Sequence, residues 1–98
     1  MKFDQENLKN RILSFIIELH ECYKNTKFPE DRALYANDIA LAIGWISDIE
    51  KIGNVDEVVN TILDPETSKS FTDYWKKGEW GDHEAKALMR LKEELRNL

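Results

Sequence analysis

The sequence predicts an all-α fold: a single small domain, a compact bundle of four or five helices covering residues 1–98. Apolar residues recur at three- and four-residue spacing along most of the chain, and no segment shows the two-residue alternation of a strand. The four Gly and two Pro residues, apart from Gly44, stand where a helix should start or stop. A chain of 98 residues can build one hydrophobic core and is too short for a second.

The first predicted helix starts at Asp4, which can serve as its N-cap, and runs to about Asn25. A second apolar stripe, formed by Leu13 and Ile17, lies beside the main one and broadens the apolar surface. We therefore expect this helix to contact two neighbouring helices. The main stripe consists of Leu8, Ile12, Phe15, Ile16, Leu19 and Tyr23.

A longer second helix is predicted from Pro29, which suits a first helical turn, to Gly53, which can take the left-handed terminal conformation. It carries two apolar stripes, so it is predicted to be the central helix, with a possible break near Asn37 and Asp38. The residues expected in its buried core are Ile39, Leu41, Ile43 and Ile46.

Three shorter helices follow. Asn54 and Glu57 resemble a capping box that starts the third helix, and Pro65 starts a fourth that stops at Gly78. Asp82 is predicted to cap the fifth helix. Because its leucine stripe is narrow, we expect this last helix at the periphery of the bundle.

The charge balance limits the partners. Nineteen Asp and Glu against fourteen Lys and Arg give a net charge of −5, which would repel nucleic acid and anionic membranes, so a basic protein partner is expected. No apolar run is long enough to span a membrane. The opening residues are polar and acidic where a secretory signal needs an apolar stretch, so a cytoplasmic chain is expected.

Residue types that carry catalysis are sparse. His20 and His83 do not stand at zinc-ligand spacing, and the chain has neither a Gly-x-Ser-x-Gly elbow nor a Gly-rich phosphate loop. Cys22, the single cysteine, has Glu18 one helical turn before it, and that carboxylate would raise the pKa of the thiol. The sequence therefore predicts no catalytic residue and no cofactor, with Cys22 as a small, partly buried apolar residue.

One carboxylate pattern offers an alternative. Glu18 and Glu21 form a Glu-x-x-Glu pair, and Asp38 ends the segment Tyr35-Ala36-Asn37-Asp38 on the next helix. This arrangement is similar to half of the pattern in the all-α nucleotide pyrophosphatases of the MazG type, whose Glu-x-x-Glu and Glu-x-x-Asp pairs hold magnesium. The resemblance covers about residues 18–38 and implies a magnesium site at Glu18, Glu21 and Asp38, with Tyr35 where the family has glutamate. Against it, Glu18 and Glu21 are expected to be solvated and Asp38 to cap a helix, so no metal site is predicted.

The segment 71–82 is the most unusual in composition, with four aromatic residues and two glycines. Trp80 lies between Glu79 and Gly81, outside both predicted helices, so it is either an anchor for a partner or an apolar plug between helices. Acidic residues surround the aromatic ones, as at the rim of an interface for a basic protein. The predicted partner-binding residues are Trp80, Glu79, Asp73, Asp82, Trp75 and Tyr74, although Tyr74 and Trp75 also fit a core-facing helix stripe.

These observations favour a non-catalytic cytoplasmic protein-binding domain, in particular an acidic inhibitor of the immunity or antitoxin kind that covers a basic partner such as a nuclease. Two alternatives remain. One is the magnesium-dependent nucleotide pyrophosphatase. The other is a homo-oligomeric structural protein that uses Leu13 and Ile17 as a two-fold interface, so the chain is expected to be a monomer or a homodimer.

Overall fold

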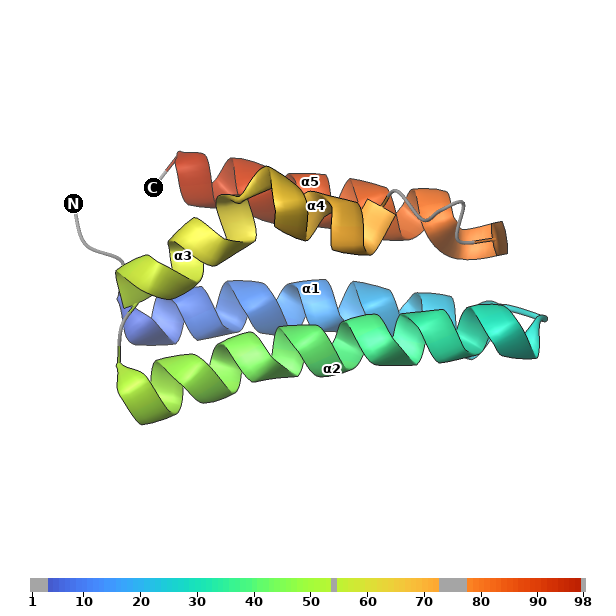
Figure 1. Ribbon diagram of the computed structural model, residues 1–98, viewed down its shortest axis with the longest axis horizontal. Helices are drawn as coiled ribbons and strands as arrows, with labels where there is room; N and C mark the ends of the chain where they lie inside the picture. Colours follow the sequence, from blue (N-terminus) through green and yellow to red (C-terminus); the bar gives the residue numbers. More distant parts are fainter. Residues whose placement is uncertain (1–3, 54, 73–77, 98) are drawn as a thin grey trace.

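The computed structural model describes residues 4–53, 55–72 and 78–97, and this part of the chain is almost entirely helical, which confirms the predicted all-α class (Figure 1). The molecule is elongated, with extents of 41 × 22 × 18 Å and a radius of gyration of 13.1 Å. Its elements are α1 (Gln5–Asn25), α2 (Pro29–Ile52), α3 (Val55–Leu63), α4 (Pro65–Thr72), the 3₁₀ turn η1 (Gly78–Trp80) and α5 (Gly81–Arg96).

The central helix is α1, and the prediction that α2 takes this place is wrong. α1 and α2 form a long antiparallel hairpin, and α5 packs along α1 on its other side (Figure 1). α3 and α4 lead from the end of α2 back over α5. The expected contact of the first helix with two neighbouring helices is confirmed, but a single apolar stripe of α1 packs against both α2 and α5.

The ends of the two long helices agree with their sequence signals. The side chain of Asp4 accepts a hydrogen bond from the Asn7 backbone N–H at 3.3 Å, which satisfies one of the free donors of the first turn of α1. Pro29 lies in the first turn of α2, and Gly53 ends this helix with φ 73°. The predicted break inside α2 is absent, because Asp38 is buried within a continuous helix and does not start a new one.

The start of α5 corrects another prediction. The helix begins at Gly81, so Asp82 lies inside the first turn, where its carboxylate pairs with Lys86 at 3.4 Å and does not cap the helix. α5 is also less peripheral than expected, since Leu88, Leu91 and Leu95 are all buried. The predicted cap at Asn54 and the stretch 73–77 of the predicted fourth helix lie outside the described residues.

The core runs along the inside of the hairpin. Phe15 of α1 stacks on Trp45 of α2, with ring centroids 6.2 Å apart and an interplanar angle of 17°. On α1, α2 and α5 the buried positions recur every three or four residues, as expected for helices that each present one stripe to the core. The remaining core residues are Leu8, Ile12, Leu19, Ala42, Ile49, Val58, Val59, Ile62, Ala87, Leu88, Leu91 and Leu95.

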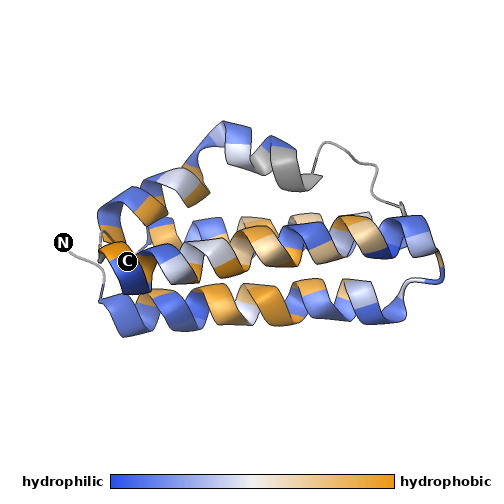
Figure 2. Cartoon of the chain, turned by 60° about the horizontal axis from the view of Figure 1, so that its bottom comes forward, coloured by the Kyte–Doolittle hydropathy of each residue, from blue (hydrophilic) through white to orange (hydrophobic). Residues whose placement is uncertain are grey.

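The predicted core of α2 is partly wrong. Ile43 is 53% exposed and Leu41 is 44% exposed, while Ile39 and Ile46 are partly buried against the core. The neighbours of α2 bury one stripe, Tyr35, Asp38, Ala42, Trp45 and Ile49, and leave the apolar residues farther from it exposed. Figure 2 shows that hydrophobic residues recur along both long helices, between hydrophilic ones.

Candidate functional site

The corner around Trp80 is tied to both long helices through its backbone. The Trp80 N–H donates a hydrogen bond to the hydroxyl of Tyr35 on α2 at 3.0 Å. The thiol of Cys22 on α1 donates to the Trp80 carbonyl oxygen at 3.7 Å. The indole itself is half-buried, and its edge meets the His83 ring with centroids 5.4 Å apart. The backbone of residue 80 therefore holds η1 against both long helices.

Gly78, at the start of η1, lets the chain reach this corner. Its φ of 68° lies in the left-handed region, which side chains other than that of glycine rarely adopt. A Cβ atom at this position would also collide with the carboxylate of Asp31 on α2. The close approach of η1 to α2 thus depends on glycine at 78.

The acidic residues that were predicted to surround Trp80 have different environments. The carboxylate of Glu79 accepts a hydrogen bond from the Lys27 backbone N–H at 3.2 Å and so joins η1 to the turn between α1 and α2. Asp82 is exposed beside Lys86. Asp73, Tyr74 and Trp75 lie outside the described residues, so the proposed partner site around Trp80 stays a prediction.

Polar side chains are buried beneath this corner. Burial, followed by the nearby carboxylates of Glu84 and Glu18, raises the pKa of the Cys22 thiol to about 12. Burial also raises the pKa of the Tyr35 hydroxyl to about 12, although its bond with the Trp80 backbone opposes the shift. Both groups are protonated at neutral pH, so Cys22 is not the thiolate that nucleophilic catalysis needs. The predicted effect of Glu18 on this thiol is confirmed in direction.

The three carboxylates of the pyrophosphatase resemblance have separate environments. A Glu18 oxygen lies 2.8 Å from the Nε2 atom of His83 on α5. Glu21 accepts a hydrogen bond from the Asn25 side-chain amide at 3.3 Å, while Asp38 is buried on α2. In residues 4–53, 55–72 and 78–97, no group of three or more His, Cys, Asp and Glu side chains is arranged to hold a metal ion.

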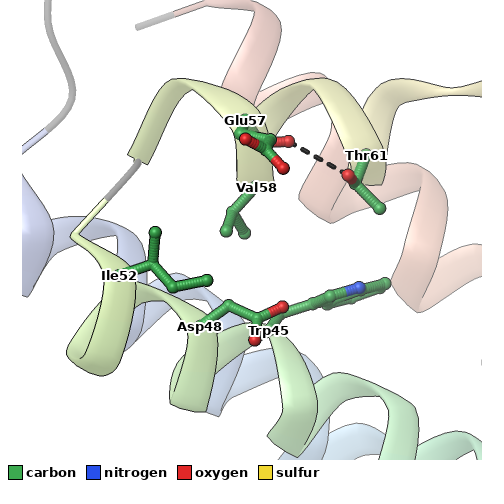
Figure 3. A pocket seen from close by; sticks show the side chains of 6 residues that line it. All are labelled: Trp45, Asp48, Ile52, Glu57, Val58 and Thr61. Carbon is green, nitrogen blue, oxygen red and sulfur yellow. Dashed lines mark hydrogen bonds between the residues drawn. The ribbon is translucent and has the colours of Figure 1, made fainter.

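A second candidate site, the α2–α3 hollow, lies at the opposite end of α2 (Figure 3). Gly53 turns the chain sharply, so that α3 folds back over the last turns of α2. The hollow has a volume of about 50 Å³ and is lined by Trp45, Asp48, Ile52, Glu57, Val58 and Thr61.

The lining of the α2–α3 hollow combines two chemistries. The indole of Trp45 and the aliphatic side chains of Ile52 and Val58 supply apolar surface, and Asp48 and Glu57 bring carboxylates from α2 and α3 (Figure 3). No basic side chain is among the lining residues. Such a surface suits the aliphatic stem and positive head of a lysine or arginine.

The groove between α1 and α5 provides a contrast, because its charges are balanced. Arg11 and Glu94, which both line it, form an ion pair at 3.2 Å. Arg90 and Glu18 are also in its lining. The α2–α3 hollow differs in composition, since the charged residues in its lining are both acidic.

Sequence reasoning missed the α2–α3 hollow because its acids have unremarkable local positions. Asp48 is on the polar side of a predicted helix, and Glu57 fits a capping box. The only available signal was the short Gly53-Asn54 connection, since it forces the following helix back onto the preceding one.

Comparison with known proteins adds no family: no protein-family model, no curated protein and no solved structure matches this chain. Within the part of the chain that the structure describes, no helix has both the length and the apolar character needed to cross a bilayer.

Proposed function

We propose that this chain is a non-catalytic, cytoplasmic protein-binding domain that receives a basic side chain of a partner protein in the α2–α3 hollow. An immunity- or antitoxin-type inhibitor that covers the active site of a basic enzyme such as a nuclease would work in this way. The observation that carries the proposal is a hollow whose lining combines the acids Asp48 and Glu57 with the apolar side chains of Trp45, Ile52 and Val58, with no base among the lining residues.

The size of the hollow favours a protein side chain over a small-molecule ligand. Its volume of about 50 Å³ is far below the roughly 300–1,000 Å³ of most cofactor and substrate pockets. A lysine or arginine can lay its methylenes on the exposed side chain of Ile52 at the rim of the hollow while its charged head lies near the carboxylates.

Electrostatics supports the same class of partner over longer distances. The net charge of −5 would attract a positively charged protein and accelerate its first encounter with this surface. Trp80, Glu79 and Asp82 then remain a predicted second contact for the partner. The indole there has less area to offer than a fully exposed residue, because it is half-buried.

Affinity capture from the native cell, followed by mass spectrometry, tests the proposal. The bait is compared with the double variant Asp48→Asn with Glu57→Gln. A matched control, Glu30→Gln with Glu93→Gln, neutralises the same number of exposed acids elsewhere. We expect a stoichiometric basic protein that the parent and the control retain and the hollow variant loses. Equal retention by all three proteins would remove the hollow from the partner site.

A further inference from the structure

The outer face of the α1–α2 hairpin carries exposed apolar side chains from both long helices. Leu13 and Ile17 of α1 are 46% and 61% exposed, and Ile43 of α2 is similarly exposed. Between them lie three partly buried isoleucines that also touch the core. We call these six residues the hairpin face: Leu13, Ile16, Ile17, Ile39, Ile43 and Ile46.

The register of the hairpin brings the members of this face together. Lys9 of α1 pairs with Glu50 of α2 at 3.4 Å, and Phe15 stacks on Trp45, so the middle of α1 lies beside the middle of α2. At 100° per residue, Leu13, Ile17 and Ile43 point to the side of the hairpin away from α5. The residues of α1 that turn toward α5 are Arg11, which binds Glu94, and Glu18, which binds His83.

The hairpin face lacks the negative charge that dominates the rest of the molecule. Residues 7–17 and 39–47 contain no Asp or Glu, although the chain has nineteen. The acids at the nearer end of the face, Glu6 and Glu50, both lie within 3.4 Å of the Lys9 ammonium group. Two chains of net charge −5 would repel each other over most approaches, and a face without Asp or Glu avoids close contacts between like charges.

We propose that the hairpin face binds the same face of a second copy, which makes the protein a two-fold symmetric dimer. Each copy would offer the same exposed apolar side chains to the other, as a closed two-fold interface requires. The dimer uses the side of α2 opposite to the α2–α3 hollow, so it does not depend on the proposed partner binding.

The available area sets the expected strength of the dimer. The acid-free stretches 7–17 and 39–47 form a face about 15 Å long and about 20 Å wide, at a rise of about 1.5 Å per residue. Two such faces would bury about 600 Å² in total, which is below the usual size of stable specific interfaces and typical of weak ones. We therefore expect a weak, reversible dimer with a dissociation constant on the order of 100 micromolar.

Sedimentation equilibrium of the full chain at concentrations from about 1 µM to about 500 µM tests whether the dimer forms. The parent should change from monomer to dimer within this range. Ile17→Lys and Ile43→Lys should each raise the dissociation constant at least about tenfold, because they place a charge in the centre of an apolar interface. Met89→Lys is the matched control, since Met89 is 61% exposed on α5, outside the hairpin face, and it should dimerise like the parent.

Three results would overturn the proposal. The first is a parent that stays monomeric across the range. The second is equal loss of dimer in Met89→Lys and Ile43→Lys. The third is an Ile43→Lys variant that circular dichroism shows to be folded and that still dimerises like the parent. If the parent is monomeric and Ile17→Lys loses a partner captured from cells, the face binds a different protein.

Discussion

The two sides of α2 have opposite electrostatic character. On the side next to α1, Ile43 and its apolar neighbours form a surface whose central stretch has no acid. On the side next to α3, the residues that line the hollow include the acids Asp48 and Glu57 and apolar side chains, and none of them is basic. One helix thus separates a surface suited to a second copy from one suited to a basic partner, and the core occupies the single stripe between them.

The largest expected effect is on the free energy of unfolding, and it should differ between substitutions in the core stripe and in the hairpin face. Ile49→Ala removes a fully buried side chain and should lower the free energy of unfolding by about 2–5 kcal/mol. Ile43→Ala should cost less than about 1 kcal/mol, because the residue is already half in solvent. Urea denaturation of both variants, at a concentration where the parent is monomeric, measures the difference. Equal losses would mean that Ile43 belongs to the core.

Substitution of Trp80, at the other end of α2, should have an intermediate effect on stability. Trp80→Ala removes a half-buried indole that meets His83, and we expect a loss of about 1–3 kcal/mol, less than the ~3–5 kcal/mol typical of a fully buried tryptophan. Thermal unfolding and partner affinity should be measured on the same variant. An unchanged melting temperature with a large loss of affinity would make Trp80 an anchor and not a plug.

Alkaline pH should weaken the fold through the same corner. The pKa of Cys22 rises from 9.0 to about 12 on folding, and that of Tyr35 from 10.0 to about 12. Since the unfolded chain loses these protons first, the contribution of both groups to stability is complete below about pH 9 and declines up to about pH 12. Urea denaturation as a function of pH should show this decline, and Tyr35→Phe should make it shallower. Labelling of Cys22 by a thiol reagent should likewise be slow until the protein unfolds.

Neutralising an acid of the α2–α3 hollow should have a smaller effect, on the rate of association with the partner, and salt should reduce this effect. With the captured partner, Asp48→Asn should slow association severalfold at low ionic strength and much less at high salt, because charges at an exposed site act partly by steering. Stopped-flow kinetics at two salt concentrations would measure this. If Asp48→Asn associates as fast as the parent at low salt, Asp48 does not steer the partner to the hollow.

Magnesium should have the smallest effect. Glu18 is bound by His83 and Glu21 by Asn25, so calorimetry should detect no micromolar magnesium binding. Micromolar binding that disappears in Glu18→Gln, together with hydrolysis of nucleoside triphosphates, would instead establish the pyrophosphatase alternative.

The sequence was a good guide to local structure. Asp4, Pro29 and Gly53 mark helix ends through capping and backbone geometry, which depend on residues close in the chain. The exceptions are the predicted break in α2, which is absent, and the start of α5, where Gly81 begins the helix before the expected cap at Asp82.

The sequence was a poorer guide to which apolar stripe is buried. α2 has apolar residues on two stripes, and the arrangement of its neighbours, which the pattern does not reveal, selects the one that includes Ile49 and leaves Ile43 exposed. For the same reason the α2–α3 hollow was missed, since Asp48 and Glu57 come to line one hollow only after Gly53 folds α3 back. Tertiary packing determined both features.

The central claim is that the two sides of α2 bind different things, and nuclear magnetic resonance of the ¹⁵N-labelled chain tests it directly. Dilution should move the amide signals of Leu13, Ile17 and Ile43, because it dissociates the dimer. Addition of the captured basic partner should move those of Asp48, Glu57 and Thr61 instead. If the partner moves the hairpin-face signals and leaves the hollow unchanged, the assignment of the two surfaces is contradicted.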